Sequence, residues 1–556
     1  MIIFNKNIQF FYRLTSFVLV TAIILLCASA CSPSYGTGSS QVWEQSAADE
    51  TDTSDYIISI EDEPDTVDFQ CTTIYYTIAQ NVFDRLVEME TDDRGDAVIL
   101  PALAESWEIS GDRRTYTFHL REGVKFSNGS PLTSSDVLYT LTRLLTHPDS
   151  CNRDIADTIV GAGPLERGET DRLEGFEVLS DRDFKLTLEE PFEAFLACLS
   201  MPGASILDAE TTEEAGSRFG KDPEWTIGTG SFILKSWEPG KGMLLTANTD
   251  CWQGKPGCAG LDLRFVTDSE EIREMFDNGR LDVLDLDEVG KSGEYYLHGD
   301  IYQDRLYQVQ RIGITYIALN ESVEPLNDVR VRKALQLALN RTALLDAAYS
   351  GHGILENGIL PHGLYGYNPE LPEIPCAPEE ARSLLKEAGY PDGFSLTITA
   401  KASSTLGEMA IVRMTASMWE KIGVSVSIKV INEDEFMRLR KKGSLACYSA
   451  TWTADYNDPD NFFYTFFGDS ENTRDRSLCY PREDIMERVR AARAIEDPEA
   501  RIREYRELEK IIVQEDAAWI PLFSRLRFYM ISGRLKGITS SWNGSVKNKY
   551  REMSIR

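Results

Sequence analysis

Two hydrophobic patterns follow each other early in the chain. Apolar and polar residues alternate over residues 115–120, which predicts a half-buried strand. Farther on, Thr133 and Asp136 have the spacing of a capping box, so a helix is expected from there to Leu145.

The later part of the chain continues the alternation of helices and strands. Apolar residues after Asp328 recur at helical spacing, and this predicted helix ends near Gly351. Pro378 and Gly389 are typical of the first turn and the end of another helix. We detect no internal repeat, and the pattern favours a mixed α/β architecture.

A β/α unit is predicted next. A helix is expected from about Leu406 to Ile422, ending at Gly423. The following alternation predicts a strand with one apolar face, formed by Val424, Val426, Ile428 and Val430.

The N-terminus has the features of an export signal. Two cations precede an apolar run over residues 16–26, which is shorter than the ~20 residues needed to span a bilayer. We therefore predict a signal peptide over residues 1–30. Residues 28–31 resemble a bacterial lipobox, which implies lipidation of Cys31; the alternative is an ordinary cleavage site that leaves a free thiol. The polar residues 31–54 are expected to form a flexible tether.

Net charge limits the class of partner, and chain length limits the number of domains. Without residues 1–30 the chain has 55 Lys and Arg against 89 Asp and Glu, a net charge of -34. This balance argues against nucleic acid as a partner. The roughly 500 remaining residues are enough for two to four domains.

Cysteine usage leaves the disulfides open. Beyond Cys31 there are eight cysteines, an even number that permits disulfides in an oxidising compartment. Cys251 and Cys258 flank a turn containing Gly and Pro and are the best-placed pair, although spacing alone does not establish the bond.

The stretch over residues 452–463 places one carboxylate, Asp455, among aromatic and turn-forming residues. Asp before Pro, together with Asn, predicts a rigid loop rather than a helix. We interpret Asp455 as an anchor for a cationic group of a ligand. The alternative is that Asp455 only caps the following turn.

Several segments together resemble the signature of family 5 extracellular solute-binding proteins. They occur in the family's order over residues 101–107, 115–129, 136–137, 228–237 and 320–335. The resemblance covers the chain from about Asp55 to its C-terminus. Residues 452–461 and 545–548 are most similar to the oligopeptide-binding branch, which feeds peptide ABC importers.

The resemblance implies the fold class and the domains. We expect an α/β, two-lobed periplasmic-binding-protein-like fold with an extra domain, three domains in all. Domain I is expected to be discontinuous and to comprise residues 55–92, 203–310 and 531–556. Domain II is expected over residues 93–202 and domain III over residues 311–530.

The resemblance also implies the function. Such a protein captures peptides between its lobes and delivers them to an ABC-type permease with its ATPase subunits. Asp455 then takes the peptide α-ammonium, and we expect Trp452, Thr453, Tyr75 and Ser403 to contact the ligand as well. The protein is expected to be a monomer, lipid-anchored on the outer face of the plasma membrane or on the periplasmic side.

One departure from the family limits these implications. Dipeptide binders carry an Arg for the peptide carboxylate in the loop that matches residues 402–404, where this chain has no cation. This argues against a specificity for dipeptides alone. Lys401 and Arg413 are nearby candidates, and the alternative for each is a solvated surface charge.

Motifs for catalysis are absent from the sequence. There is no Gly-x-Ser-x-Gly elbow, His-Glu-x-x-His helix, phosphate-binding Gly-rich loop or Cys-x-x-Cys pair, so we expect neither an enzyme nor a cofactor. Two other functions stay open. One is a non-peptide cargo such as nickel, haem or another small solute, with His352 and His362 as candidate ligands. The other is a surface peptide sensor without transport.

Overall fold

The computed structural model describes residues 54–92, 97–299 and 302–556. The chain separates into two units, Met1–Asp52 and Thr53–Arg556. The predicted signal peptide, Cys31 and nearly all of the tether therefore lie outside the described residues. Within the described ranges, no helix has both the length and the apolar run needed to cross a membrane.

A twelve-stranded sheet runs through the unit Thr53–Arg556. The order of its main path is β16 (Val424–Ile431), β15 (Phe394–Lys401), β17 (Cys447–Thr453), β13 (Gly313–Leu319), β18 (Trp519–Ile531), β11 (Val283–Asp285), β1 (Tyr56–Ile60), β10 (Gly260–Arg264), β9 (Gly242–Ala247) and β8 (Phe232–Glu238). Two further strands, β12 (Leu306–Gln310) and β14 (Gly353–Leu355), pair with β18.

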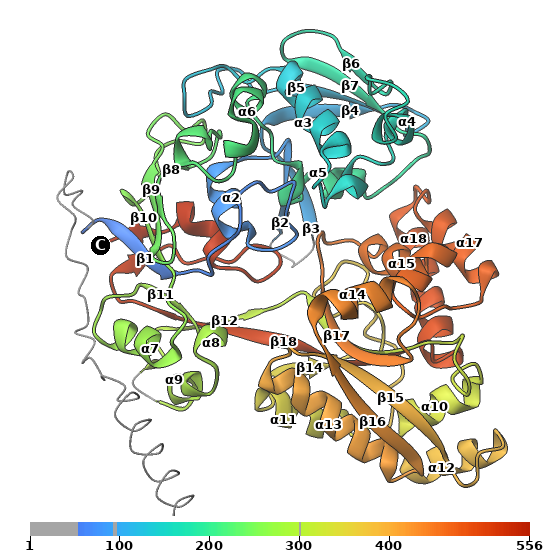
Figure 1. Ribbon diagram of the computed structural model, residues 1–556. Helices are drawn as coiled ribbons and strands as arrows, with labels where there is room; N and C mark the ends of the chain where they lie inside the picture. Colours follow the sequence, from blue (N-terminus) through green and yellow to red (C-terminus); the bar gives the residue numbers. More distant parts are fainter. Residues whose placement is uncertain (1–53, 93–96, 300–301) are drawn as a thin grey trace, which may run out of the picture. The chain divides into compact units, whose positions relative to one another are not determined.

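The long strand β18 is shared between two lobes. Its beginning pairs with β13, where Trp519 lies opposite Ala318, and its end pairs with β11, where Ile531 lies opposite Val283. Figure 1 shows β18 as the long red strand that connects the two groups of strands. We call the region containing β1 and β8 to β11 the first lobe and the region containing β13 to β17 the second lobe.

A second, four-stranded antiparallel sheet belongs to the first lobe. Its order is β4 (Ala104–Ile109), β5 (Thr115–Leu120), β7 (Asp183–Thr187) and β6 (Phe176–Val178). The buried residues of β5 pack with those of the helix α3 (Ser134–Thr146) in one hydrophobic core. The backbone N–H of Thr133 donates to Asp136 Oδ2 over 2.8 Å, so the predicted strand and capping box are both confirmed.

The helices and smaller strands surround these sheets (Figure 1). In addition to α3 they are α2 (Tyr76–Val82), β2 (Val87–Thr91), β3 (Ala97–Pro101), α4 (Ala162–Glu166), α5 (Phe195–Leu199), α6 (Ala209–Ala215), α7 (Ser269–Asp277), α8 (Leu286–Val289), α9 (Glu294–His298), α10 (Val329–Leu337), α11 (Arg341–Tyr349), α12 (Pro378–Glu387), α13 (Leu406–Glu420), α14 (Glu433–Lys441), α15 (Asp460–Phe467), α16 (Ser470–Asp475), α17 (Glu483–Ala492), α18 (Pro498–Glu509), β19 (Leu535–Lys536) and β20 (Ser554–Ile555).

The helix predicted after Asp328 is in fact two helices. Asn340 separates α10 from α11, and its side chain accepts a hydrogen bond from the backbone N–H of Ala343 over 3.0 Å. An Asn side chain satisfies the free N–H groups of a helix start, so a new helix begins here despite the continuous apolar spacing. The end near Gly351 is confirmed.

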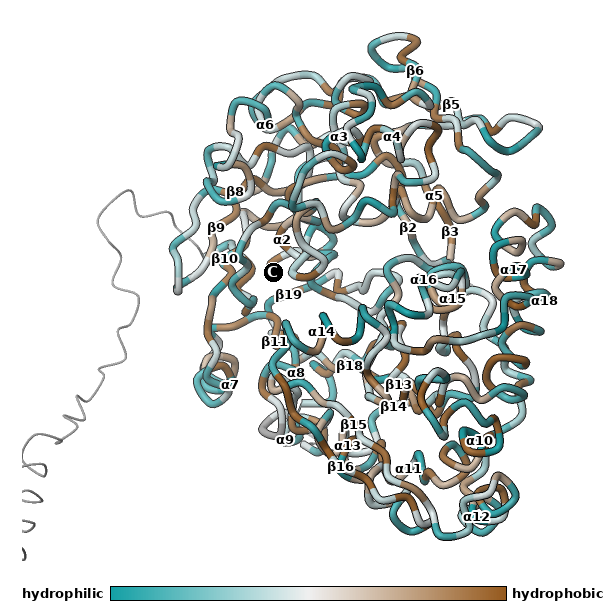
Figure 2. The backbone as a smooth tube through the Cα atoms, turned by 45° about the vertical axis from the view of Figure 1, so that its right-hand side comes forward, coloured by the Kyte–Doolittle hydropathy of each residue, from teal (hydrophilic) through white to brown (hydrophobic). Residues whose placement is uncertain are grey.

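The predicted helices α12 and α13 are confirmed, with Pro378 in the first turn of α12. Figure 2 shows hydrophobic and hydrophilic positions alternating along α12, which buries Ala381 and Leu385. The strand β16 is confirmed too, but its apolar face is not fully buried. Ile428 and Val430 are exposed because β16 forms the edge of the sheet.

The best-placed cysteine pair is not bonded. Cys251 and Cys258 are separate, buried thiols, and Cys251 Sγ lies 3.8 Å from Ser231 Oγ. The α/β, two-lobed architecture agrees with the expected fold class. The positions at which domains I, II and III begin and end stay predictions.

Candidate functional site

A cavity of about 760 Å³ has walls from both lobes. This volume is typical of sites that enclose small ligands. Its lining residues include Thr73, Tyr76, Arg85, Glu90, Asn152, Asp154, Arg311, Lys401, Glu433, Arg440, Trp452, Thr453, Asp455, Arg476 and Lys549.

The loop that follows β17 places Asp455 on the second-lobe wall. Asn461, buried in the first turn of α15, holds this loop with three hydrogen bonds. Its Oδ1 accepts from Trp452 Nε1 (3.2 Å) and from the backbone N–H of Asp455 (3.1 Å), and its Nδ2 donates to Asp455 Oδ2 (3.0 Å). The rigid loop expected over residues 452–463 is limited to residues 454–459, because Trp452 and Thr453 belong to β17 and residues from Asp460 onward form α15.

The Asp455 carboxylate is reached by solvent through the cavity, yet protein surrounds much of it. Loss of solvation raises its pKa to about 6; the Asn461 hydrogen bond opposes this rise, Asp154 adds to it and Arg476 opposes it. Among the described residues, no cation forms an ion pair with Asp455. The carboxylate is therefore mainly ionised at neutral pH, and Arg476 acts on it without forming an ion pair.

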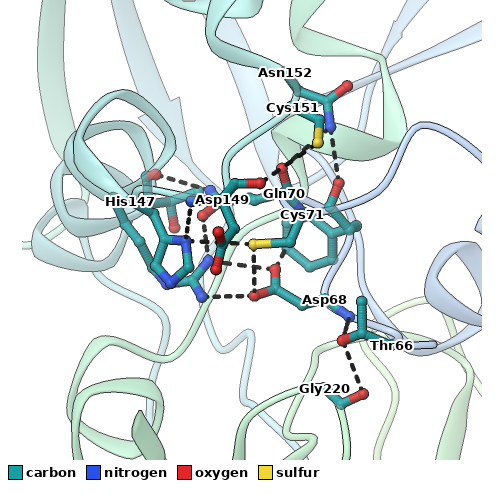
Figure 3. A network of polar contacts seen from close by, with 12 residues as sticks. Thr66, Asp68, Gln70, Cys71, His147, Asp149, Cys151, Asn152 and Gly220 are labelled. Carbon is teal, nitrogen blue, oxygen red and sulfur yellow. Dashed lines mark hydrogen bonds and ion pairs between the residues drawn. The ribbon is translucent and has the colours of Figure 1, made fainter. Parts of the chain in front are cut away.

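The first-lobe wall is held by Asn152, whose amide fixes the segment before α2. Its Nδ2 donates to the carbonyl oxygens of Phe69 (3.1 Å) and Thr72 (2.9 Å), and Tyr76 Oη donates to its Oδ1 (3.1 Å). Figure 3 shows Asn152 in a polar network with residues before α2. The network thus positions Tyr76 and Asn152 on the cavity wall.

The same network contains a Cys, a His and an Asp side by side (Figure 3). Cys71 Sγ lies 3.4 Å from His147 Nδ1 and 3.3 Å from Asp68 Oδ2. Burial, followed by the Asp68 charge, raises the pKa of Cys71 to about 12. The Asp68 carboxylate itself pairs with Arg143 over 2.6 Å. The thiol therefore stays protonated, unlike the thiolate of a nucleophilic site.

The structure brings Trp452, Thr453 and Asp455 together on one wall. Tyr75 does not line the cavity: it is 44% exposed at the start of α2, and the adjacent Tyr76 lines the cavity instead. Ser403 does not line it either, and its hydroxyl donates to Glu433 Oε2 over 2.5 Å. Ligand contacts by the five predicted residues stay predictions.

The two cations considered for a peptide carboxylate differ in position. Lys401 lines the cavity and pairs with Glu433 over 3.0 Å, whereas Arg413 is exposed on α13 and does not line it. Asp154, Arg440 and Arg476 also line the cavity, and none of them was predicted from the sequence. Arg440 lies in the last turn of a helix and Arg476 in a polar segment, so neither shows a local signal of a site.

The histidines considered for a metal or haem lie elsewhere. His352 Nε2 is 3.9 Å from Glu294, the His362 ring packs on Tyr367, and neither lines the cavity. Over the described ranges, no group of three or more His, Cys, Asp and Glu residues is arranged to hold a metal ion.

Comparison with known proteins relates most of the chain to binding proteins. The chain is 29% identical over 483 residues to heme-binding protein A of Haemophilus influenzae, covering 84% of this chain and 86% of that protein. It is 28% identical over 513 residues to the dipeptide-binding protein of Escherichia coli, covering 88% and 91%.

A solved structure shares the fold. It is the ABC transporter-associated periplasmic binding protein DppA from Helicobacter pylori in complex with peptide STSA, with a TM-score of 0.72 and 24% identity, covering 90% of this chain and 98% of that one. The family model for bacterial extracellular solute-binding proteins, family 5 Middle, matches residues 98–474. The sequence resemblance is thus confirmed, and the chain belongs to the family 5 bacterial extracellular solute-binding proteins.

Proposed function

We propose that this protein is the substrate-binding subunit of a peptide importer. It captures peptides in the cavity between its lobes and delivers them to an ABC-type permease driven by ATPase subunits. The observation that carries this proposal is Asp455, a carboxylate on the cavity wall that forms no ion pair among the described residues. The dipeptide-binding relative and the peptide-bound structure agree with it.

The chemistry of the site suits a peptide N-terminus. An α-ammonium enclosed by the cavity must be paired, because an isolated charge away from water is very costly. The Asp455 carboxylate offers a charge-assisted hydrogen bond worth about 1.5–3 kcal/mol. Asn461 holds that carboxylate in place before the ligand arrives, which reduces the entropy lost on binding.

The second-lobe wall also offers backbone groups. Strand β15 pairs with β17 only at Cys447, so the residues of β17 that line the cavity, Thr451 and Trp452 among them, have no paired strand on that side in the described structure. A peptide backbone can bind there as an added strand, and such main-chain pairing tolerates varied side chains.

We infer that the protein acts by binding rather than by catalysis. Its Cys71, His147 and Asp68 cluster holds a protonated thiol, and the family is one of solute-binding proteins. We further propose that it works as a monomer in which domain I is discontinuous, with the boundaries expected from the family resemblance.

We propose that the mature chain is anchored by lipid at Cys31 on the outer face of the plasma membrane. A diacylated Cys supplies two chains, about the minimum for stable attachment. Cys31→Ala is expected to release the protein to the medium or to stall its processing. Unchanged fractionation of this variant with membranes would contradict the anchor.

A second candidate function is haem transport, because one relative is a haem-binding protein. The two functions predict different ligands in the protein purified from its own cells. Native mass spectrometry is expected to show peptides that dissociate when the protein unfolds. A bound haem, visible also by its Soret absorbance, with no peptide present would overturn the peptide proposal.

A further inference from the structure

Among the described residues six cations line the cavity, and three of them are already neutralised. These three cations form ion pairs: Arg85 with Glu88, Lys401 with Glu433 and Lys549 with Glu90. In the part of the chain that the structure describes, no ion pair forms with Arg311, Arg440 or Arg476. Arg311 belongs to a cluster at the junction of the lobes, with Arg525, Arg527, Asp285 and Asp287. Arg440 and Arg476 remain on the second-lobe wall.

The two arginines are neighbours. Arg440 lies in the last turn of α14, and its carbonyl oxygen accepts a hydrogen bond from the hydroxyl of Ser477, the residue after Arg476, over 2.7 Å. Burial, followed by the nearby charge of Arg440, lowers the pKa of Arg476. The Asp455 carboxylate acts on Arg476 from a distance but forms no ion pair with it in the described structure, so the two guanidinium groups still repel each other, and an anion between them removes that repulsion.

A structural role accounts for only part of this arrangement. A cation in the last turn of a helix is stabilised by the helix dipole, but Arg438 and Lys441 already supply that charge on α14. Arg440 Nε is also buried without a hydrogen-bond partner. Nε of Arg85 and of Arg525, which form ion pairs, is buried in the same way, so this atom does not by itself indicate a ligand. Among the described residues Arg440 forms no ion pair although it lines the cavity.

The Arg476 guanidinium is already oriented for a planar anion. Its Cζ lies 4.7 Å from the centre of the Trp452 ring and 5.3 Å from that of Phe466. Such stacking uses the face of the guanidinium and leaves its edge N–H groups free for a bidentate contact. A carboxylate has the matching geometry.

The spacing from Asp455 limits the length of the ligand. Asn461 bonds both Asp455 and Trp452, and Arg476 stacks on Trp452, over 3.0, 3.2 and 4.7 Å. These linked contacts bring the Asp455 carboxylate and the Arg476 guanidinium close enough for each charge to shift the pKa of the other, and an extended chain advances about 3.3 Å per residue. A ligand whose two ends bind these groups is therefore short, such as a peptide of two or three residues.

We propose that Arg440 and Arg476 form the subsite for the C-terminal carboxylate of a di- or tripeptide whose ammonium is held by Asp455. This inference rests on the proposed function. It assigns to α14 and the segment before Ser477 the role that family dipeptide binders give to the loop matching residues 402–404.

The test compares randomised di- and tripeptide libraries as free acids and as C-terminal amides. Binding of the full-length protein is measured by competition and native mass spectrometry. The wild type is expected to prefer the free acid by about 10- to 100-fold, which corresponds to a charged hydrogen bond. Arg476→Gln and Arg440→Gln are expected to lower this preference towards one, and Arg476→Lys to restore part of it.

Arg438→Gln is the matched control, since it removes the same charge from an exposed position on α14. It is expected to keep the wild-type preference. The inference is overturned if peptides bind but both glutamine variants retain that preference, or if longer peptides outcompete both libraries. If neither library binds the wild type, the proposed function fails as well.

Discussion

Asp455 and Asp458 lie three residues apart, yet the structure gives them opposite surroundings. Asp458 is buried and accepts from both Arg501 Nη1 (2.8 Å) and Arg501 Nη2 (2.7 Å). The nearby Asp460 is also buried, with Arg493 Nε 3.0 Å from its Oδ1. In the described structure the side chain of Asp455 bonds the neutral Asn461 amide, forms no ion pair and faces the cavity. Among the described residues, Asp458 and Asp460 thus each pair with an arginine, whereas Asp455 forms no ion pair.

This difference assigns two roles within one short segment: Asp458 stabilises the fold, and Asp455 is available to a ligand. A buried ion pair with both partners present fixes the local fold, and removing one partner leaves an uncompensated charge. A carboxylate that faces a cavity without an ion pair loses part of its solvation, and no paired charge in the free protein offsets that loss. Its raised pKa records that cost, which a cationic ligand group can offset. Substitutions at the two carboxylates should therefore separate stability from binding.

The largest expected effect is on folding. Asp458→Asn leaves the Arg501 guanidinium buried without its bidentate partner, so the free energy of unfolding should fall by about 3–5 kcal/mol. Denaturant unfolding with matched probes gives this value. Asp455→Asn serves as the control and should unfold at the wild-type midpoint or slightly above it. Equal losses of unfolding free energy in the two variants would contradict the proposed difference between the two carboxylates.

The second effect is on binding. Asp455→Asn keeps the shape of the side chain but removes its charge, and a peptide ammonium then lacks a partner. Affinity for a free peptide should weaken by about 2–5 kcal/mol, tens- to thousands-fold. Fluorescence or calorimetric titration measures it. Unchanged affinity would mean that the ammonium binds elsewhere.

The third effect is a dependence on pH. A proton competes with the ammonium for Asp455, whose pKa is about 6 in the free protein. Affinity should therefore be constant above pH 7 and weaken as the pH falls through 6, approaching tenfold per pH unit. Asp154 and Arg476 also act on this carboxylate, so Asp154→Asn is measured alongside. A wild-type profile that Asp455→Asn leaves unaltered would contradict the assignment.

The smallest effect concerns positioning. Asn461→Ala removes the amide that orients Asp455, and affinity should fall by about 1 kcal/mol, roughly fivefold. Asn472→Ala removes another amide contact, to the Tyr464 carbonyl, away from the cavity and serves as the control. Equal changes in both variants would show a general effect on the fold.

Local signals predicted much of the fold. The capping box at Thr133 and the Pro378 start of α12 depend on neighbouring residues only, and both are present. The break at Asn340 was missed because an amphipathic pattern continues through it. The exposure of Ile428 and Val430 depends on β16 being an edge strand, which its own residues do not encode.

The site was predictable only in part, because it too depends on residues that are distant in the sequence. Asp455 and Asp458 have similar neighbours in the sequence, and the cation that distinguishes them, Arg501, lies 43 residues beyond Asp458. Local chemistry made Asp455 a candidate but left open that it only caps a turn, and the family resemblance favoured the ligand anchor. Arg440 and Arg476 come from segments that meet only in the folded chain, so no pattern joined them.

The central claim is that Asp455 binds a peptide ammonium, and one thermodynamic cycle tests it most directly. Calorimetry with a free and an N-acetylated version of one peptide is performed on the wild type and on Asp455→Asn. We expect acetylation to weaken wild-type binding tens- to thousands-fold and to have little further effect on Asp455→Asn. Equal binding of both peptides by the wild type, with Asp455→Asn binding as tightly, would contradict the claim and favour a non-peptide ligand.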